Sequence, residues 1–207
     1  MVVSVQEICL ACGSADVRDE AIWTREQVIN AYEGAFRAVP DQVADMDDVQ
    51  LMECSQCKLQ FFSPVEVGDE AFYDWIAEND HYALDRWEFH QILSRLGASE
   101  TILDIGAGSG RFALAARERG HDVYCVDGSG AARRHLQSLG FEVGRSLQDF
   151  DERSVRPTIV TAIQVLEHVS DPLEFLRQIR CRYSDCRIAV AVPDRRRNRF
   201  LHEPFDV

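Results

Sequence analysis

The amino-acid sequence predicts an α/β fold: a mostly parallel sheet with flanking helices, preceded by a small cysteine-rich module. Three observations lead to this prediction. Residues 99–193 alternate short apolar runs with segments of helical periodicity, which is typical of βαβ units. A glycine cluster, Gly106-Ala107-Gly108-Ser109-Gly110, follows the first of those runs. Two Cys-x-x-Cys pairs lie within residues 1–65.

The elements of the larger part follow in order from this alternation. The run 101–105 is apolar and leads into a glycine turn, as a buried strand does. Apolar side chains recur at helical spacing over 112–119, and Gly120 stands where a glycine commonly ends a helix. The same reasoning predicts further strands and helices, joined by right-handed crossovers. The strands are 122–126, 141–143, 158–163 and 187–192, and the helices are 131–139 and 172–180.

Length and composition suit one small module and one larger domain, since the chain has 207 residues, 46% hydrophobic and 28% charged. We expect a module over 1–65, a helical cover or connector over 66–98 and an α/β domain over 99–207. The net charge of −13 disfavours a nucleic-acid partner. The arginine run within 195–199 is interpreted as a solvated loop.

The sequence also indicates a cellular compartment. No apolar run reaches the roughly 18 residues that a membrane span needs, so no membrane association is predicted. The first ten residues lack the basic start of a signal peptide. We therefore expect the cytoplasm, where seven cysteines indicate metal ligation or burial instead of disulfides.

The glycine cluster lies where open α/β sheets bind ligands, at the carboxyl end of a strand. Glycine adopts backbone angles closed to other residues and lets a ligand approach the main chain, although a tight turn alone also needs glycines. Asp104 lies two residues before Gly106, and Asp127 ends the next predicted strand. A carboxylate at the position of Asp127 can accept hydrogen bonds from both hydroxyls of a ribose.

The same arrangement would serve a nicotinamide dinucleotide. The dinucleotide motif places its third glycine three positions after the second, where this sequence has Arg111. Arg111 is instead consistent with a helix that starts beneath a smaller ligand without pyrophosphate.

The loop resembles the first motif of class I, Rossmann-like methyltransferases that depend on S-adenosylmethionine (SAM). Asp127 falls at that family's ribose-binding acid, and Asp149-Phe150 resembles the acidic and apolar pair that contacts adenine. Residues 165–172 resemble the motif VLEHxxDP, so the resemblance extends over about 99–193. It implies SAM as the cofactor and the following binding residues: Asp104, Gly106, Ala107, Gly108, Gly110, Asp127, Asp149, Phe150 and Gln164.

The two cysteine pairs predict a zinc-ribbon-like module with a helical insert. Four thiolates complete a tetrahedral zinc site, and because they leave no open position we expect a structural Zn²⁺. The segment 25–39 has helix-like content and fills the long interval between the pairs. Two unrelated reduced pairs are the alternative, and a redox role is disfavoured because neither pair opens a helix after a strand. The predicted ligands are Cys9, Cys12, Cys54 and Cys57, with Gly13 and Lys58 following at the turns.

A zinc ribbon in front of such a methyltransferase domain resembles a bacterial arrangement that includes some sugar C-methyltransferases. In the family, the helix before the first strand covers the cofactor, and its aromatic residues line the substrate pocket. We interpret most aromatic residues of 66–98 as packing residues and those with polar tips as pocket candidates. The packing residues are Phe72, Trp75, Trp87 and Phe89, and the pocket candidates are Tyr73, His81 and Tyr82.

His168 is the candidate catalytic base, because an imidazole titrates near neutral pH. Its alternative role is to shape the loop or cap a helix. Methyl transfer itself needs little acid–base help, since in-line positioning of donor and acceptor supplies most of the rate.

These observations predict a SAM-dependent methyltransferase that acts on a small-molecule acceptor. A catalytically weak, zinc-containing SAM-binding module for protein contact and, third, a nicotinamide-dependent enzyme are the alternatives. No feature predicts a particular oligomeric state. The resemblance implies two further strands after the fifth, and the 207-residue chain ends soon after it, so we expect a truncated chain or a reduced sheet.

Overall fold

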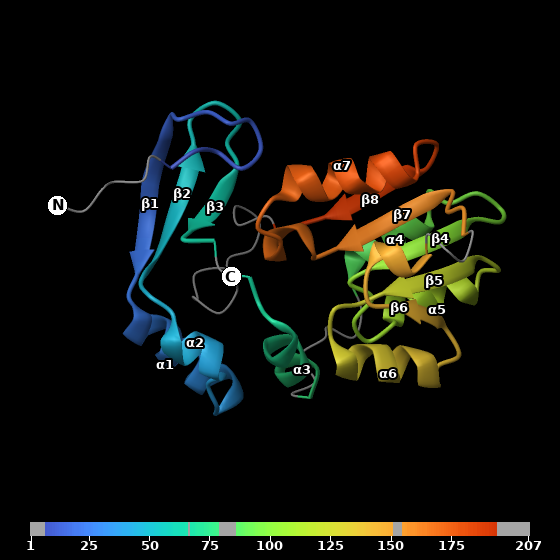
Figure 1. The fold of residues 1–207 in the computed structure, drawn as a ribbon, viewed down its shortest axis with the longest axis horizontal. Helices are drawn as coiled ribbons and strands as arrows, with labels where there is room; N and C mark the ends of the chain where they lie inside the picture. Colours follow the sequence, from blue (N-terminus) through green and yellow to red (C-terminus); the bar gives the residue numbers. More distant parts are fainter. Residues whose placement is uncertain (1–6, 66, 79–85, 151–154, 194–207) are drawn as a thin grey trace. The chain divides into compact units, whose positions relative to one another are not determined.

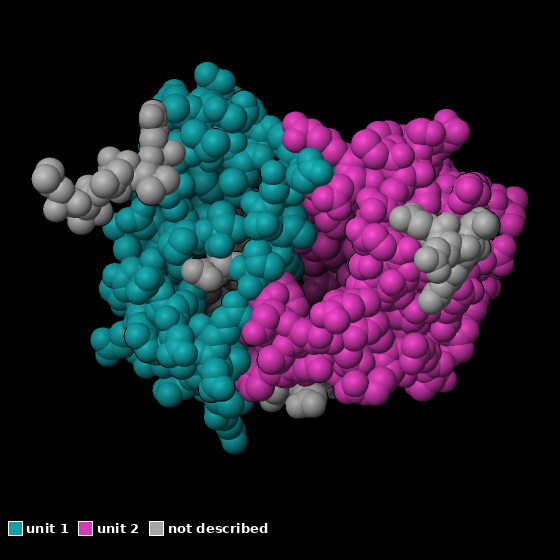
Figure 2. All heavy atoms as spheres, viewed as in Figure 1, with its two compact units in different colours: residues 1–67, 167–174, 194–207 teal, residues 68–166, 175–193 magenta. Residues whose placement is uncertain are grey.

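The computed structural model describes residues 7–65, 67–78, 86–150 and 155–193. These residues form two compact units, which Figure 2 distinguishes by colour. Unit 1 contains the described residues up to Val67 together with Glu167–Glu174. Unit 2 contains the described residues of Gly68–Leu166 and Phe175–Pro193.

Unit 1 is built on an antiparallel sheet in the order β1-β2-β3 (Figure 1). Helix α1 confirms the helical insert that the sequence predicts between the cysteine pairs. It begins with a capping box in which Thr24 and Gln27 satisfy each other's backbone N–H groups. The strands are β1 (Val17–Trp23), β2 (Val49–Cys54) and β3 (Gln60–Ser63), and the helices between β1 and β2 are α1 (Arg25–Phe36) and α2 (Asp41–Asp45).

Unit 2 is a parallel sheet of five strands among the described residues, in the order β6-β5-β4-β7-β8. Each strand that the sequence predicts is present, so the predicted Rossmann-like fold class is confirmed. The strands are β4 (Thr101–Ile105), β5 (Asp122–Val126), β6 (Glu142–Gly144), β7 (Ile159–Ile163) and β8 (Arg187–Ala191). The helices are α3 (Glu70–Glu78), α4 (Trp87–Leu93), α5 (Arg111–Arg117), α6 (Gly130–Ser138), most of α7 (Pro172–Arg182) and the short 3₁₀ helix η1 (Leu147–Phe150). Most of the 3₁₀ helix η2 (Leu166–His168) and the first residues of α7 lie in the segment that groups with unit 1.

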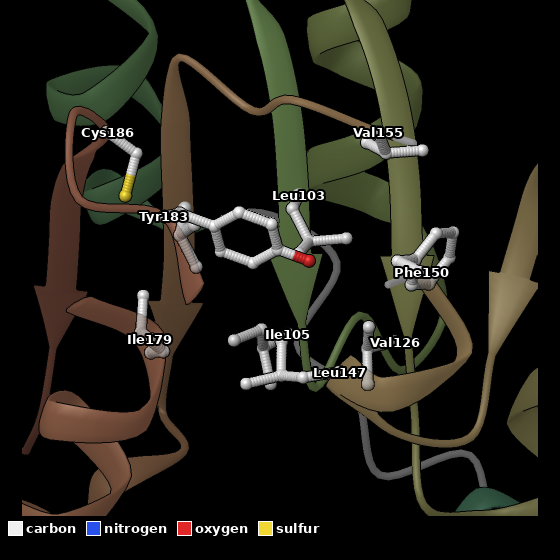
Figure 3. Close-up of a cluster of buried hydrophobic side chains, with 10 residues drawn as sticks. Leu103, Ile105, Val126, Leu147, Phe150, Val155, Ile179, Tyr183 and Cys186 are labelled. Atoms are coloured by element: carbon white, nitrogen blue, oxygen red, sulfur yellow. The ribbon is translucent and has the colours of Figure 1, made fainter. Parts of the chain in front are cut away.

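The central strand β4 alternates its side chains between two hydrophobic cores. Leu103 and Ile105 pack with Phe150 and Ile179 on one face of the sheet (Figure 3). Ile102 points to the other face, where it packs in the cluster of α4 and α5. Each such fully buried side chain stabilises the fold by about 1.5–3 kcal/mol. Packing on both faces of the sheet therefore holds β4 in place. Its carboxyl end carries Asp104 and leads into the glycine loop.

The aromatic residues of the connector divide into packed and exposed side chains. Phe89 packs against Phe112, with ring centroids 5.6 Å apart. Trp87, which the sequence analysis interprets as a packing residue, is 66% exposed, so that interpretation is wrong. It is the first residue of the short helix α4, in which Leu93 and Phe89 belong to the hydrophobic cluster and Trp87 does not.

Within the described ranges, no helix combines the length and apolar character that a bilayer crossing requires. Three expectations fall outside the described residues. They concern the pocket candidates His81 and Tyr82, the arginine run within 195–199 and any strand that follows Pro193.

Candidate functional site

The four predicted metal ligands come together in unit 1, where their sulfur atoms all lie within 4.8 Å of one another. Cys9 Sγ is 3.4 Å from Cys57 Sγ, and Cys12 Sγ is 3.6 Å from Cys54 Sγ. A tetrahedral zinc ion with bonds of about 2.3 Å places its sulfur ligands about 3.8 Å apart. The cluster therefore has the donor set and the size of a Cys₄ zinc site.

The two knuckles share one backbone pattern. The N–H of Gly13 donates to the carbonyl of Cys9 at 2.9 Å, and the N–H of Lys58 donates to the carbonyl of Cys54 at 3.0 Å. Gly13 and Lys58 both have left-handed backbones, with φ of 70° and 63°. Each pair of cysteines is thus followed by a residue whose conformation turns the chain back, which is strained for lysine and easy for glycine.

Backbone N–H groups also point at the sulfur atoms. The N–H of Ala11 lies 3.4 Å from Cys9 Sγ, and the N–H of Cys57 lies 3.5 Å from Cys54 Sγ. The bond from Cys57 is the main reason why the pKa of the Cys54 thiol is lowered, whereas the neighbouring sulfurs and burial raise the pKa of the Cys12 and Cys57 thiols. The cluster therefore favours one thiolate among neutral thiols when no metal is bound.

In unit 2, the glycine loop follows β4 directly. Gly106, Gly108 and Gly110 have φ of 66°, 52° and 73°, a left-handed region that favours glycine. A β-carbon at position 106 would lie 2.5 Å from Cγ2 of Val165, too close for any other residue without movement. Gly106 is exposed, so its main chain is open to a ligand at this edge of the sheet.

The remaining glycine of the motif has a packing role of its own. Gly110 is the N-cap of α5, and a β-carbon there would lie 2.8 Å from Cδ2 of Leu136. The N–H groups of Gly106 and Ala107 both donate to the carbonyl of Val126, at 2.8 Å and 3.2 Å. These contacts hold the loop against the end of β5, where Asp127 follows.

Asp127 is buried, with 8% of its surface exposed, and its carboxylate organises the loops around it. Oδ2 accepts a hydrogen bond from the N–H of Gly108 at 2.8 Å, and Oδ1 accepts one from the N–H of Ser129 at 2.9 Å. Burial raises its pKa, and the two backbone bonds partly offset this rise. A carboxylate oxygen can accept more than one hydrogen bond, so both oxygens keep capacity for a hydroxyl donor.

Asp104 is buried more deeply, at 3% exposed, and bonds to the neighbouring strand. Its Oδ1 accepts a hydrogen bond of 2.6 Å from the hydroxyl of Thr161, its register partner on β7. Burial raises the pKa of Asp104 to about 7; the Thr161 bond opposes this shift, and the charge of Asp127 adds to it. The sequence analysis missed Thr161, whose signal is one polar residue within the apolar run of β7.

The β4–β7 junction is the topological switch point of the sheet, because β4 continues to β5 on one side and pairs with β7 on the other. Ligands of open α/β sheets bind at such a point. Gln164 follows β7 at this edge and has φ of 57°, an uncommon conformation for a residue other than glycine. Its Nε2 donates to Glu88 Oε1 on α4 at 3.3 Å, and its N–H donates to the carbonyl of Ala191 at 2.8 Å.

The structure separates the two members of the predicted adenine pair. Asp149 is exposed, and its Oδ2 accepts hydrogen bonds from the N–H groups of Arg145, at 2.5 Å, and Ser146, at 3.3 Å. The Phe150 side chain is fully buried and packs edge-on against Tyr124, with centroids 5.9 Å apart. An adenine contact stays a prediction for both residues, and the observed role of the Phe150 ring is core packing.

His168 ends η2 and belongs to the segment Glu167–Glu174, which groups with unit 1. Burial lowers the pKa of its imidazole, which favours the neutral form at neutral pH. The rest of this motif starts a helix: Asp171 Oδ1 accepts the N–H of Glu174 at 2.8 Å, and Pro172 is the first residue of α7. A catalytic role of His168 stays a prediction.

Hydrogen bonds therefore join the glycine loop to the end of β5 and to Asp127, and Asp104 lies next to them at the carboxyl end of β4, at the switch point of a parallel sheet. A left-handed glycine loop with exposed main chain at Gly106, and buried carboxylates at the carboxyl ends of two adjacent parallel strands, define a Rossmann-like α/β domain. A family model described as a methyltransferase domain matches residues 76–202, which is more than half of the 207 residues. The chain belongs to this family of methyltransferase domains.

Solved structures of methyltransferases are similar to part of this chain. The CcbJ methyltransferase from Streptomyces caelestis is 22% identical with a TM-score of 0.50, and the match covers 59% of this chain and 58% of that one. For a SAM-dependent methyltransferase from Archaeoglobus fulgidus, the identity is 19%, the TM-score 0.48 and the coverage 60% and 59%. A coclaurine N-methyltransferase is 20% identical with a TM-score of 0.42, and the match covers 54% of this chain and 37% of that one.

The chain thus spans well under two thirds of the length of these relatives. At 22% identity and a TM-score of 0.50, the likeness to the CcbJ methyltransferase shows a common fold alone. A search of curated protein sequences finds no match.

Proposed function

We propose that the chain is a SAM-dependent methyltransferase that transfers a methyl group to a small-molecule acceptor. The observation that carries this proposal is the glycine loop with the carboxylates of Asp104 and Asp127 at the switch point of a methyltransferase-family domain. SAM supplies a methyl group on a positively charged sulfur, which is a good leaving group. Buried carboxylates favour a cation in a site of low dielectric, so the electrostatics suit this ligand.

Each residue of the site has its own proposed role in binding SAM. Asp127 accepts hydrogen bonds from the ribose hydroxyls with the capacity that its two backbone bonds leave. Gly106 and Ala107 offer main chain that a ligand can approach, Gly108 fixes the loop to Asp127 through its N–H, and Gly110 is the N-cap of α5. Asp149, in η1 after β6, and Gln164, directly after β7, are proposed to contact the cofactor. Asp104 is proposed to contribute negative charge to the cofactor site.

A small molecule is the proposed acceptor because the net charge of −13 opposes the binding of a phosphate backbone. His168 is proposed as a base that accepts a proton from the acceptor, since its lowered pKa keeps the imidazole neutral. Cytoplasmic location stays a prediction.

For unit 1 we propose a structural Zn²⁺ held by Cys9, Cys12, Cys54 and Cys57. Support comes from four sulfurs within 4.8 Å and from backbone N–H groups directed at two of them. Because four thiolates fill the coordination sphere, the ion would stabilise the β1–β2–β3 sheet and take no part in the transfer.

Turnover separates this proposal from a catalytically weak SAM-binding module. We expect the chain to convert SAM to S-adenosylhomocysteine when pools of small-molecule acceptors are supplied, as measured by mass spectrometry of both compounds. The variant His168→Asn should lower kcat by about 10²-fold, the lower end of the usual contribution of a general base because methyl transfer needs little acid–base help, and leave the affinity for SAM within twofold. A chain that binds S-adenosylhomocysteine but converts no SAM with any pool would favour the weak binding module. Wild-type kcat in the folded variant would reassign His168 to loop shaping.

A further inference from the structure

Helix α3 lies before the sheet in sequence and contacts α6 within unit 2. Its first turn is fixed by Asp69, whose Oδ1 accepts the N–H of Phe72 at 2.8 Å. Glu70 and Asp74 are four residues apart and therefore lie on the same face of α3. Both carboxylates reach the loop between β5 and α6, which carries Asp127.

Asp74 is connected to Asp127 through one intermediate residue. Its Oδ1 accepts hydrogen bonds from the Ser129 hydroxyl at 2.5 Å and from the N–H of Ala131 at 3.0 Å. Ser129 is 1% exposed, and its own N–H donates to Asp127 Oδ1 at 2.9 Å. The bonds from Ala131 and Ser129 hold the pKa of Asp74 below its ordinary value, so the carboxylate is ionised at the positive end of α6.

Glu70 reaches the same loop by a second route. Its Oε1 accepts a hydrogen bond of 2.9 Å from Arg133 Nη2. Nη1 of Arg133 in turn donates to the carbonyls of Asp127, at 3.0 Å, and Gly128, at 2.5 Å. Glu70 Oε2 also pairs with Arg145 at 3.0 Å, and the N–H of Arg145 donates to Asp149. One glutamate therefore connects the loops that carry Asp127 and Asp149.

The first turn of α6 leaves room for both acids. A β-carbon at Gly130 would lie 3.3 Å from Glu70 Oε1 and 3.5 Å from Asp74 Oδ2. The first turn of α6 therefore lies directly against both acids of α3.

We propose that Glu70 and Asp74 are positioning residues of the cofactor site. Asp74 acts through Ser129 and Glu70 through Arg133, and together they hold the β5–α6 loop in the conformation in which Asp127 binds the ribose. This inference rests on the proposed function, in which Asp127 binds the ribose of SAM. A loop that is already held loses less conformational freedom when the ligand binds, so affinity rises without any contact between α3 and the ligand.

The test is calorimetric titration of S-adenosylhomocysteine into the full chain. Asp74→Asn and Glu70→Gln keep the shape of each side chain and remove its charge, and each should weaken binding about three- to tenfold, because a charge-assisted hydrogen bond is roughly twice as strong as a neutral one. Glu118→Gln is the matched control, because Glu118 is an exposed acid at the end of α5, and its affinity should stay within twofold. Circular dichroism and thermal melting confirm that each variant is folded.

A double-mutant cycle with Asp127→Ala distinguishes positioning from general stability. Because Asp74 acts through Asp127, Asp74→Asn should change affinity less than twofold when Asp127 is already alanine. Equal losses in both backgrounds, or folded Asp74→Asn and Glu70→Gln variants that bind as the wild type does, would overturn the positioning role. A wild-type chain that binds no S-adenosylhomocysteine would instead contradict the proposed function itself.

Discussion

The Cys54→Ser variant is expected to lose its zinc and the ordered β1–β2–β3 sheet of unit 1. Cys54 is fully buried and packs with Cys9, Met52 and Phe61, so a serine hydroxyl there would lie among apolar side chains without its metal bond. Structural zinc sites contribute roughly 10–16 kcal/mol of apparent binding energy in small peptides. Whole domains are stable by only about 5–15 kcal/mol, so a small sheet does not survive this loss.

Metal analysis of protein purified without chelator checks this prediction. The wild type should carry about one zinc ion per chain, and Cys54→Ser much less, with a loss of strand signal by circular dichroism. Cys181→Ser is the matched control, because Cys181 is exposed and lies on α7, outside the cluster. A wild type without zinc, or a Cys54→Ser variant with the zinc content and spectrum of the wild type, would contradict the assignment.

Asp104→Asn is expected to make the ligand-free protein more stable above pH 7 and to weaken SAM binding at least tenfold. The pKa of Asp104 is about 7 in the folded chain, while an unfolded aspartate titrates near 3.9. The folded state therefore holds more protons between these values, and stability falls as pH rises from about 4 to 7, by at most about 1.4 kcal/mol per unit. Asparagine still accepts the Thr161 bond but carries no charge, so it removes this pH-dependent cost.

Urea unfolding of wild type and variant at several pH values measures the effect. The stability gain of Asp104→Asn should grow from pH 5 to pH 7 and level off above, reaching on the order of 2–4 kcal/mol. Asp122→Asn is the control, since Asp122 is exposed at the opposite end of the neighbouring strand. A variant whose stability difference from wild type is the same at pH 5 and pH 8 would show that Asp104 is not a buried charge.

Local patterns predict the elements of unit 2 well, because the determinants are local. The run 101–105 and the run 122–126 coincide with β4 and β5, since each is an apolar segment bounded by turn residues. The cysteine cluster was predictable for a similar reason: two residues between paired cysteines form a knuckle, and two knuckles make a tetrahedral donor set.

The residues that the sequence analysis missed act across long separations. Thr161 bonds Asp104 from 57 positions away, and Ser129 bonds Asp74 from 55 positions away. No spacing rule connects such pairs, because the contact exists only after the sheet has assembled and α3 has packed on α6. The sequence pattern also did not reveal that Trp87 is exposed, because tertiary contacts decide which side chains of a short helix are packed.

The central claim is that the loop of Asp104–Gly110 and Asp127 binds the nucleoside of SAM, and one calorimetric experiment tests it most directly. S-adenosylhomocysteine and NAD are each titrated into the wild type, Asp127→Ala and Asp122→Ala, with circular dichroism to confirm folding. The wild type and Asp122→Ala should bind S-adenosylhomocysteine and give no binding heat with NAD. Asp127→Ala should bind about ten- to a hundredfold more weakly, since it loses charge-assisted hydrogen bonds to the ribose. Binding of NAD without S-adenosylhomocysteine, or unchanged affinity in a folded Asp127→Ala protein, would contradict the assignment.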